Sequence, residues 1–493
     1  MVRTSFAFVF ALVLAAWVTG CPSGVGNGNL PPSGQFYFPS GIMHVDSALS
    51  PEGVLFVANA NFDKRYSSGS VVGLNLSTLG LPTFGDPVGP KGPVQLPLNV
   101  NDAGIVLITS FAGEMAALDL GGGRTRLFIP SRSEGMKLQA IDADPLASPT
   151  AQPVLHCSTP EGTSPSDCGT NAPSLSPKAF ELSTTGVPRA PGPFGVAVRP
   201  RACTTSCPVG TCQAGRCMTT NPAGVAEPYA DVFVTHITQA DSPLATGLLP
   251  RGYLIRLASQ NPTVTESSFI NIGVGATNSV VSGRRYVFTS GRGLNPTGNL
   301  MRLVDPETIN DDGGTLVYSA GLEQSFRAIE ARGIQLSSDE RRIYIAARIP
   351  DSLLVATIDD PSAVRPIIQV ARSVPLPASP NEMRIIPRVG RSDLLVIACT
   401  GAQSVAIYDD EVGDLVAQVN GVGLSPFDVT VDLRGAGARL YVSDFDDGRI
   451  AVIDIPDLLR PQDARLVAHL GEQQLCLTQG QRNPSLCDAG VGQ

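Results

Sequence analysis

The sequence predicts an all-β fold in which one antiparallel unit is repeated around an axis, and three observations support this prediction. Residues 425–455 divide at a period of two into three short strands, FDVTVDL, RLYVSD and RIAVIDI, separated by turn-forming clusters. Similar strands recur upstream. The chain has 51 Gly and 41 Pro but only 16% charged residues. Because one such unit cannot bury its apolar face alone, the copies are expected to stack radially as a single β-propeller.

The middle strand of the unit is its clearest marker. Candidates rich in β-branched and aromatic residues begin at positions 55, 106, 232, 286, 343, 394 and 440, and they read LFVAN, VLITS, VFVTH, YVFTS, IYIAA, LLVIAC and LYVSD. Apart from the gap between 106 and 232, they recur about every fifty residues, as four-stranded blades with modest loops require. We therefore predict seven blades, with six or eight as the alternatives.

The repeated sequence pattern resembles that of a known family. PSGIMHV with LFVANANF and GSVVGLNL, then PFGVAV, and finally SPFDVTV with LYVSDFDDGRIAVIDI are similar to the YVTN-type propeller repeat of bacterial envelope proteins. The resemblance covers about residues 41–455. It implies the fold but little about activity, because the same fold carries unrelated functions.

The N-terminus is typical of an exported protein. An apolar run over residues 6–18 is too short for a spanning helix and indicates a secretory signal peptide. The tetrapeptide VTGC that ends at Cys21 resembles the lipobox of bacterial lipoproteins. This resemblance implies cleavage after residue 20 and a lipid on Cys21, a diacylglycerol with palmitate chains. The alternative is an ordinary signal peptide with an incidental cysteine. Pro22 gives no retention signal for the inner membrane, so we expect an outer-membrane lipoprotein facing the periplasm or the cell surface.

The expected organisation follows from these assignments. GQFYFPSG begins the fold, and QFYF is expected to pair with the last blade and close the ring. Two loop-like, cysteine-containing insertions interrupt the pattern. The predicted parts are a signal peptide at 1–20, a flexible tether at 21–34, a propeller at 35–471 with insertions at about 129–190 and 200–228, and a C-terminal tail at 472–493.

The ten cysteines divide by context. Cys21 is the lipid site, and Cys399 lies within a strand as a small buried hydrophobe. The other eight lie in polar loops, which in an exported protein predicts four disulfides. We expect Cys157 to pair with Cys168 and Cys476 with Cys487, and we leave three pairings open among Cys203, Cys207, Cys212 and Cys217. A zinc site at that cluster is the alternative, although its spacings lack the usual CxxC pair.

Composition and motifs argue against several functions. A net charge of −9 disfavours a nucleic-acid partner. The four histidines are scattered, without the spacing of a zinc protease or a haem protein. The acidic turn at 444–448 is shorter than a calcium loop and is expected to be a polar blade turn. We therefore predict no metal and no other cofactor in a non-catalytic protein.

The fold predicts where a small-molecule site would lie. Inner strands of a propeller line its axis, and their first residues converge at one mouth. These candidate contacts are His44, Arg327, Asn381, Glu382 and Asp428. Arg327 has the chemistry to bind a carboxylate or phosphate, and Glu382 or Asp428 that of a general base. The expectation we favour is that these polar groups pair with one another or are solvated.

Two functions are consistent with the sequence. The first is a monomeric, non-catalytic, envelope-anchored module that binds or scaffolds another envelope component and attaches to the membrane through Cys21. The alternative is a propeller enzyme of the lactonase or sugar-dehydrogenase type, with its site at the channel mouth. Only this alternative calls for a divalent cation.

Overall fold

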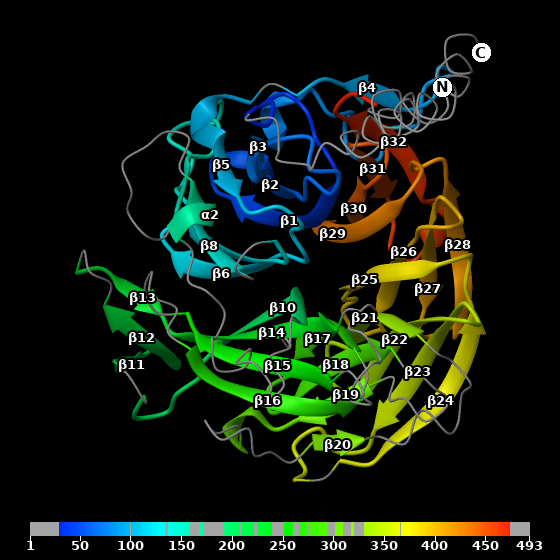
Figure 1. Ribbon diagram of the computed structural model, residues 1–493. Helices are drawn as coiled ribbons and strands as arrows, with labels where there is room; N and C mark the ends of the chain where they lie inside the picture. Colours follow the sequence, from blue (N-terminus) through cyan, green and yellow to red (C-terminus); the bar gives the residue numbers. More distant parts are fainter. Residues whose placement is uncertain are drawn as a thin grey trace, which may run out of the picture.

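The computed structural model is an all-β ring of antiparallel sheets (Figure 1). The structure describes residues 29–473 except 99, 134–136, 158–166, 172–190, 208–209, 221–223, 239–250, 260–265, 275, 293–300, 309–316, 320–329 and 365. The predicted signal peptide, Cys21, Arg327 and the pair Cys476 and Cys487 lie outside the described residues. Within the described residues, no helix has both the length and the apolar character needed to cross a membrane.

The first half of the ring contains three four-stranded sheets, and in each the strand nearest the axis comes first in the sequence. The first sheet is β1 (Pro39–Ser47), β2 (Ser50–Asn59), β3 (Gly69–Asn75) and β5 (Ile105–Ile108). The second is β6 (Ala116–Gly121), β7 (Arg124–Ser131), β8 (Lys137–Ala143) and β9 (Leu155–Cys157). The third is β10 (Pro191–Pro200), β14 (Ala230–Thr238), β15 (Arg251–Ala258) and β16 (Glu266–Val274).

The next part of the ring is one eight-stranded sheet. It contains β17 (Ala276–Ser282), β18 (Val287–Arg292), β19 (Met301–Val304), β20 (Val317–Ser319), β21 (Glu330–Leu336), β22 (Arg342–Arg348), β23 (Ser352–Ile358) and β24 (Ile368–Pro375). A single residue pair, Arg292 with Glu330, joins β18 to β21. Counting this sheet as two four-stranded units would give the predicted seven blades, a number that stays a prediction.

The remaining sheets complete the ring. One consists of β25 (Pro380–Ile386), β26 (Leu394–Cys399), β27 (Ser404–Asp409) and β28 (Asp414–Asn420). The last contains β29 (Pro426–Arg434), β30 (Gly437–Asp444), β31 (Arg449–Ile455) and β32 (Arg465–Leu470). The three strands predicted at 425–455 are therefore confirmed. Short helices lie in connections: η1 (Leu76–Thr78), η2 (Asp102–Gly104), α2 (Cys168–Asn171), η5 (Pro306–Thr308) and η6 (Pro461–Asp463).

The apolar core lies between neighbouring sheets, as radial stacking requires. One cluster of buried side chains joins the last sheet to the first, and it includes Leu55, Val72, Tyr441, Val452 and Ala468. Other clusters join the second sheet to the third and the sheet of β25–β28 to the last. Each sheet thus buries both faces, which explains why the middle strands read as continuous apolar runs.

The ring closes differently from the prediction. Residues 35–38 (QFYF) do not form a strand, although Phe36 is buried against the last sheet. Instead, β4 (Val94–Leu96), which belongs to the long connection after β3, pairs in parallel with β32. This pairing covers an edge that would otherwise be open.

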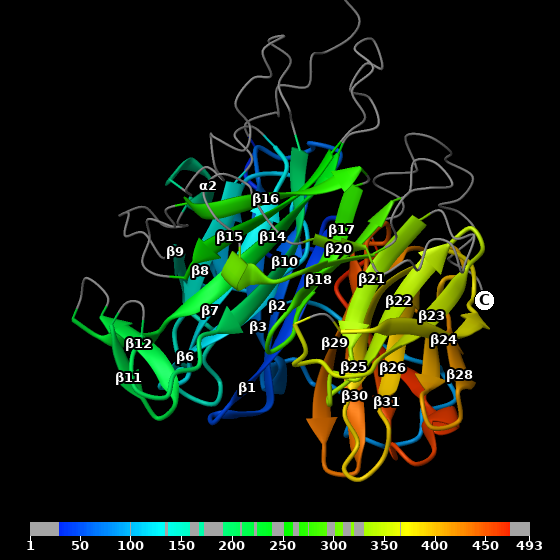
Figure 2. The ribbon, with the colours of Figure 1, turned by 90° about the horizontal axis from the view of Figure 1, so that it is seen from below.

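Two further expectations are corrected. The strand at 106–110 was expected in the middle of a second blade, but β5 is the outermost strand of the first sheet and pairs with β3. The range 129–190, expected to be an insertion, contains β8 and β9, which complete the second sheet. Within the range 200–228, β11 (Thr211–Gln213), β12 (Arg216–Thr220) and β13 (Ala226–Pro228) make a separate small sheet at the periphery (Figure 2).

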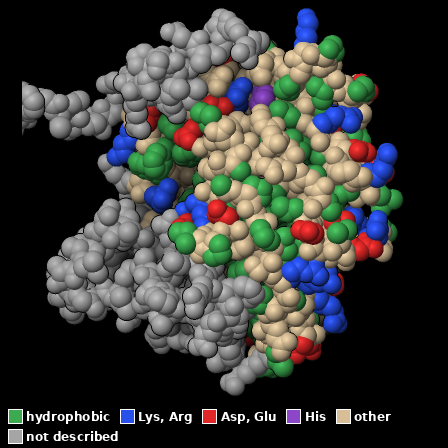
Figure 3. All heavy atoms as spheres, turned by 90° about the vertical axis from the view of Figure 1, so that its right-hand side faces the viewer, with side chains coloured by type: hydrophobic (Ala, Val, Ile, Leu, Met, Phe, Trp, Pro, Cys, Tyr) green, Lys and Arg blue, Asp and Glu red, His purple; other side chains and the backbone are tan. Residues whose placement is uncertain are grey.

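The outer edge of the ring is polar where it faces solvent. On the face shown in Figure 3, around β24 and β28, acidic and basic side chains lie interspersed. Exposed positions alternate with partly buried ones along β24. Charges on an edge strand discourage pairing with another chain.

Candidate functional site

A cluster of four charged side chains lies at the ring axis, near the first residues of the inner strands. Glu114 precedes β6, Glu382 and Arg384 belong to β25, and Asp428 belongs to β29. We call these four residues the axial charge cluster. The three carboxyl groups are buried, whereas the Arg384 side chain keeps 22% of its surface exposed. Charges this deep must be paired or must change their protonation state.

Hydrogen bonds hold the acidic members in place. Arg384 lies 3.1 Å from Oδ1 of Asp428, and the backbone amide of Ile42 donates to Oδ2 of the same carboxylate. The amide of Val196 donates to Glu114, and the hydroxyl of Ser279 donates to Glu382. The cluster therefore connects residues from sheets around the whole axis.

The cluster holds three carboxyl groups but one cation, and burial together with this excess of acidic groups raises the pKa values of Glu114 and Glu382. Burial and the neighbouring Glu382 raise the pKa of Glu114 well above its usual value. Burial and the charge of Asp428 raise the pKa of Glu382 to about 7. Two adjacent carboxyl groups cannot both ionise cheaply in a buried site, so burial next to Glu382 favours the protonated form of Glu114.

Glycines allow the inner strands to approach this closely. A Cβ at Gly113 would lie 2.3 Å from the carbonyl oxygen of Phe194. A Cβ at Gly333 would lie 2.7 Å from the carbonyl oxygen of Asn381 and 3.1 Å from Glu382. Any larger residue at either position would push neighbouring strands away from the axis.

Six phenylalanines gather at the same end of the axis. Their rings form one connected chain with centroid separations of 5.1 to 6.3 Å, in the order Phe111, Phe62, Phe38, Phe445, Phe427 and Phe194. We call these six residues the phenylalanine cluster. They come from loops and strand starts of the first, third and last sheets. Phe427 directly precedes Asp428, which places the aromatic rings next to the axial charge cluster.

Two features distinguish the phenylalanine cluster from ordinary core. Phe62 exposes 48% of its surface, and Phe38 and Phe111 adopt left-handed backbone conformations with φ of 52° and 62°. A bulky residue in this region costs about 1–3 kcal/mol. The fold accepts this cost at two neighbouring aromatic positions, and such strain is typical of functional surfaces.

Two cations lie against the same aromatic rings. Nζ of Lys64 lies 5.5 Å from the centroid of Phe111, and the guanidinium of Arg132 lies 5.4 Å from that of Phe194. Among the described residues, Nε of Arg132 is buried without a hydrogen-bond partner. Burial lowers the pKa of Arg132. The aromatic end of the axis therefore carries positive charge at its margin, above carboxyl groups at greater depth.

The structure brings together only part of the predicted site. Glu382 and Asp428 both belong to the axial charge cluster, where Asp428 pairs with Arg384 and Glu382 accepts a hydrogen bond from Ser279. Asn381 lies nearby, but its side chain makes hydrogen bonds to the two neighbouring sheets. It donates to the carbonyl of Phe427 and accepts from Arg348. His44 lies further along β1, where its Nε2 is 3.0 Å from the carbonyl oxygen of Glu52 and 3.7 Å from Asp432.

Sequence reasoning missed Glu114, Arg384 and the aromatic rings. Glu114 is missed because residues 106–110 are predicted as a middle strand, so the strand after them, β6, is not recognised as the inner strand that begins the second sheet. A usable signal was present: Gly-Glu at 113–114 stands at the start of an apolar strand, as Asn-Glu does at 381–382. The phenylalanines lie far apart in the sequence, in loops and in β10 and β29, so only the folded ring brings them together.

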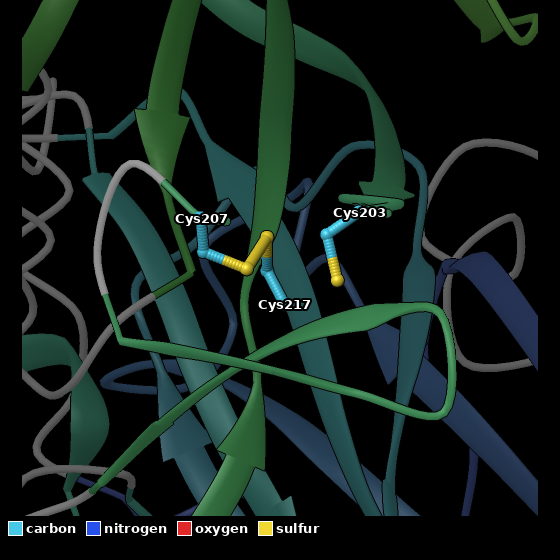
Figure 4. A group of neighbouring side chains, drawn as sticks. All are labelled: Cys203, Cys207 and Cys217. Atoms are coloured by element: carbon cyan, nitrogen blue, oxygen red, sulfur yellow. A yellow bond between two sulfur atoms is a disulfide. The ribbon is translucent and has the colours of Figure 1, made fainter. Parts of the chain in front are cut away.

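Three disulfides are present among the described residues, all from the predicted loop cysteines. Cys157 is joined to Cys168, with Cα atoms 5.3 Å apart. Of the three pairings left open, the structure has Cys203 with Cys212 and Cys207 with Cys217, and Figure 4 shows the latter bond beside Cys203. Although the sulfur atoms of Cys203, Cys207 and Cys217 lie within 4.8 Å of one another, disulfide sulfurs are not the thiolates that zinc requires.

Two smaller predictions concern the last sheets. Cys399 is fully buried in β26, and burial raises the pKa of its thiol to about 12. The acidic turn after β30 is tied to the protein itself, since Asp444 accepts from the backbone amides of Leu424 and Ser425 and Asp447 pairs with Arg449. These contacts fit a polar blade turn.

Comparison with known proteins supplies no activity. No protein-family model matches the chain, and no curated protein matches it significantly. Among solved structures, hydrazine synthase of Kuenenia stuttgartiensis has 12% identity and a TM-score of 0.46, over 88% of this chain and 99% of that chain. AztD of Citrobacter koseri has 10% identity and a TM-score of 0.39, over 87% of each chain.

A putative 6-phosphogluconolactonase of Bacteroides uniformis has 15% identity and a TM-score of 0.37, over 76% of this chain and 83% of that chain. Similarities this distant carry no functional argument. With the arrangement of its own sheets around one axis, the chain is an all-β protein with the β-propeller fold.

Proposed function

We propose that the chain is an envelope-anchored, non-catalytic binding module that contacts another envelope component through the phenylalanine cluster. The observation that carries the proposal is the convergence of six aromatic rings at one end of the axis, with Phe62 half exposed and two of the rings on strained backbone. Exposed aromatic side chains on a rigid scaffold are favourable anchors for a protein partner, because little conformational entropy is lost on binding.

The charges at the margin indicate the partner's chemistry. Lys64 and Arg132 flank the phenylalanine cluster, so the complementary segment would present apolar side chains next to carboxylates. The lipobox-like VTGC motif and the tether at 21–34 support placement of the ring at a membrane surface.

The proposal is tested by capturing partners from detergent-solubilised envelopes with three versions of the chain. Phe62→Ser should lose a stoichiometric partner that wild type retains. Leu459→Ser should retain it, because Leu459 is 62% exposed but follows the far end of β31. Equal recovery by all three versions would contradict the proposal. Cys21→Ser tests the anchor separately, since it should release the folded protein from the membrane.

One observation favours the enzymatic alternative. Glu382 has a pKa of about 7 next to the protonated Glu114, and such a pair is suited to general acid–base catalysis near neutral pH. A screen of lactones and sugars with wild type and Glu382→Gln tests this. Turnover that disappears in Glu382→Gln would favour the enzyme, and no turnover by wild type would remove its support.

A further inference from the structure

A second group of polar side chains lies where the first and last sheets meet, further along the inner strands than the axial charge cluster. His44 and Asp46 belong to β1 and Asp432 to β29. One potential ligand atom from each lies within 4.8 Å of the others. A hydrogen bond joins β1 to β29 here, because the amide of His44 donates to the hydroxyl of Thr430. Residues remote in sequence thus converge where the first and last sheets of the ring meet.

The environment holds the imidazole in a defined place. The side chain of His44 is only 4% exposed, and its ring stacks on Tyr441 at a centroid distance of 5.7 Å and an interplanar angle of 9°. The carbonyl oxygen of Glu52 lies 3.0 Å from Nε2. Asp46 is exposed, so the group is open to solvent on one side. A fixed imidazole beside an accessible carboxylate resembles a prepared ligand set.

The local charges do not balance. Three carboxylates, those of Asp46, Glu52 and Asp432, face one guanidinium, that of Arg434, which contacts both Glu52 and Asp432. Arg439 also contacts Glu52, but the charge of Arg439 is already neutralised by its ion pair with Asp454. With the carboxylates ionised, two negative charges remain, the amount that one divalent cation would neutralise. Arg434 contacts Oδ2 of Asp432, the oxygen that lies 3.7 Å from Nε2 of His44.

A buried hydroxyl provides an independent indication. Oη of Tyr441 is buried and, among the described residues, has no hydrogen-bond partner. Leaving such a group unsatisfied costs about 1–3 kcal/mol. Tyr441 stacks on His44 and interacts electrostatically with Arg434 and Arg439, and then with Asp432 and Glu52. A water bound to a cation at this group would give the hydroxyl a partner.

We propose that His44, Asp46 and Asp432 form a site for a divalent transition-metal ion such as Zn²⁺. One imidazole and two carboxylates are ligands that zinc accepts, and three protein ligands leave a further position for water. The ion would bridge β1 and β29 and so fasten the first sheet to the last. This site is distinct from the axial charge cluster and does not depend on the proposed binding function.

The test uses the purified full chain, stripped with a chelator under non-reducing conditions and titrated with Zn²⁺ by calorimetry. Wild type should bind about one equivalent, and its melting temperature should rise with Zn²⁺, because a ligand of the folded state stabilises it. Asp46→Asn and His44→Gln should each weaken binding at least about tenfold and abolish the rise. Because Asp46 is exposed, its substitution should leave the fold intact.

The matched control is His156→Gln, since His156 lies 3.7 Å from Asp144 in an exposed pair that has no third potential ligand among the residues the structure describes. It should bind Zn²⁺ like wild type. The absorption spectrum of the Co²⁺ form should lack thiolate charge-transfer bands, which would otherwise reveal binding by cysteines. The proposal is overturned if wild type binds no stoichiometric Zn²⁺, if Asp46→Asn binds it equally well, or if thiolate bands appear.

Discussion

The backbone amide of Ile42 donates a hydrogen bond to Oδ2 of Asp428 over 3.2 Å, although the two residues are 386 positions apart. The other oxygen of this carboxylate pairs with Arg384 of the neighbouring sheet. One buried side chain therefore links the first sheet to the last two. This makes Asp428 part of the ring closure as well as of the axial charge cluster.

Asp428→Ala should lower the free energy of unfolding by about 3–5 kcal/mol, because it leaves Arg384 and the Ile42 amide without their partner. Urea unfolding followed by circular dichroism measures this loss. Asp463→Ala, which removes a partly exposed carboxylate in η6 that pairs with Arg460, should cost less than about 1 kcal/mol. A similar small loss for Asp428→Ala would show that the carboxylate does not hold the ring together.

The free energy of unfolding should depend on pH in an unusual direction. The pKa of Glu382 is about 7, above its ordinary 4.5. Between these values the folded state binds more protons than the unfolded state, so stability is greatest at the acidic end and falls as pH rises through 7. In wild type, the free energy of unfolding should decrease by on the order of 1–3 kcal/mol over this pH range because of Glu382, and Glu382→Gln should abolish that decrease.

Urea titrations at several pH values compare wild type, Glu382→Gln and the exposed control Glu307→Gln. The neighbours of Glu382 are the carboxyl groups of Glu114 and Asp428 and the guanidinium groups of Arg384 and Arg332, and all are retained in both variants. If Glu382→Gln showed the same decrease as wild type, the proton would be held elsewhere.

The small sheet of β11–β13 should depend on its own disulfides. Peptide mapping without reduction should recover the pairs Cys203 with Cys212 and Cys207 with Cys217. The double variant Cys207→Ser/Cys217→Ser should make residues 203–228 more sensitive to proteases while the ring keeps its melting temperature, because in the described part of the chain β11, β12 and β13 form a sheet of their own. Pairing of Cys203 with Cys207 would contradict the structure.

Cys399 should be inert in the folded protein. Its thiol is fully buried and its pKa is about 12, so it remains a protonated thiol throughout the neutral range. Alkylating reagents should modify it only after denaturant is added. Modification at the same rate with and without denaturant would mean that β26 opens readily.

The sequence predicted the fold well where strands are local and apolar. The three strands predicted at 425–455 are confirmed as β29, β30 and β31. The alternation of apolar and polar residues and the turn residues between the strands determine them within a short stretch of sequence. The errors arose where distant pairing decides: β5 belongs to the sheet before it, and β4 closes the ring by pairing with β32. Neither pairing leaves a mark in the local pattern.

The candidate site was predicted in part for the same reason. The rule that inner strands begin at one mouth was enough to find Glu382 and Asp428. It could not find Glu114, because residues 106–110 were predicted as a middle strand and the strand after them was not recognised as an inner one. The phenylalanine cluster combines loop residues with residues of β10 and β29 from three sheets, which only the closed ring brings together.

The most direct test of the proposed function places a photocrosslinking amino acid at position 62, or at position 459 as the control, and irradiates intact cells. A discrete crosslinked species should form from position 62 and be absent from position 459, and Lys64→Glu should diminish it by removing a complementary charge. No discrete species from position 62, or the same species from both positions, would contradict the claim that the phenylalanine cluster is the binding surface.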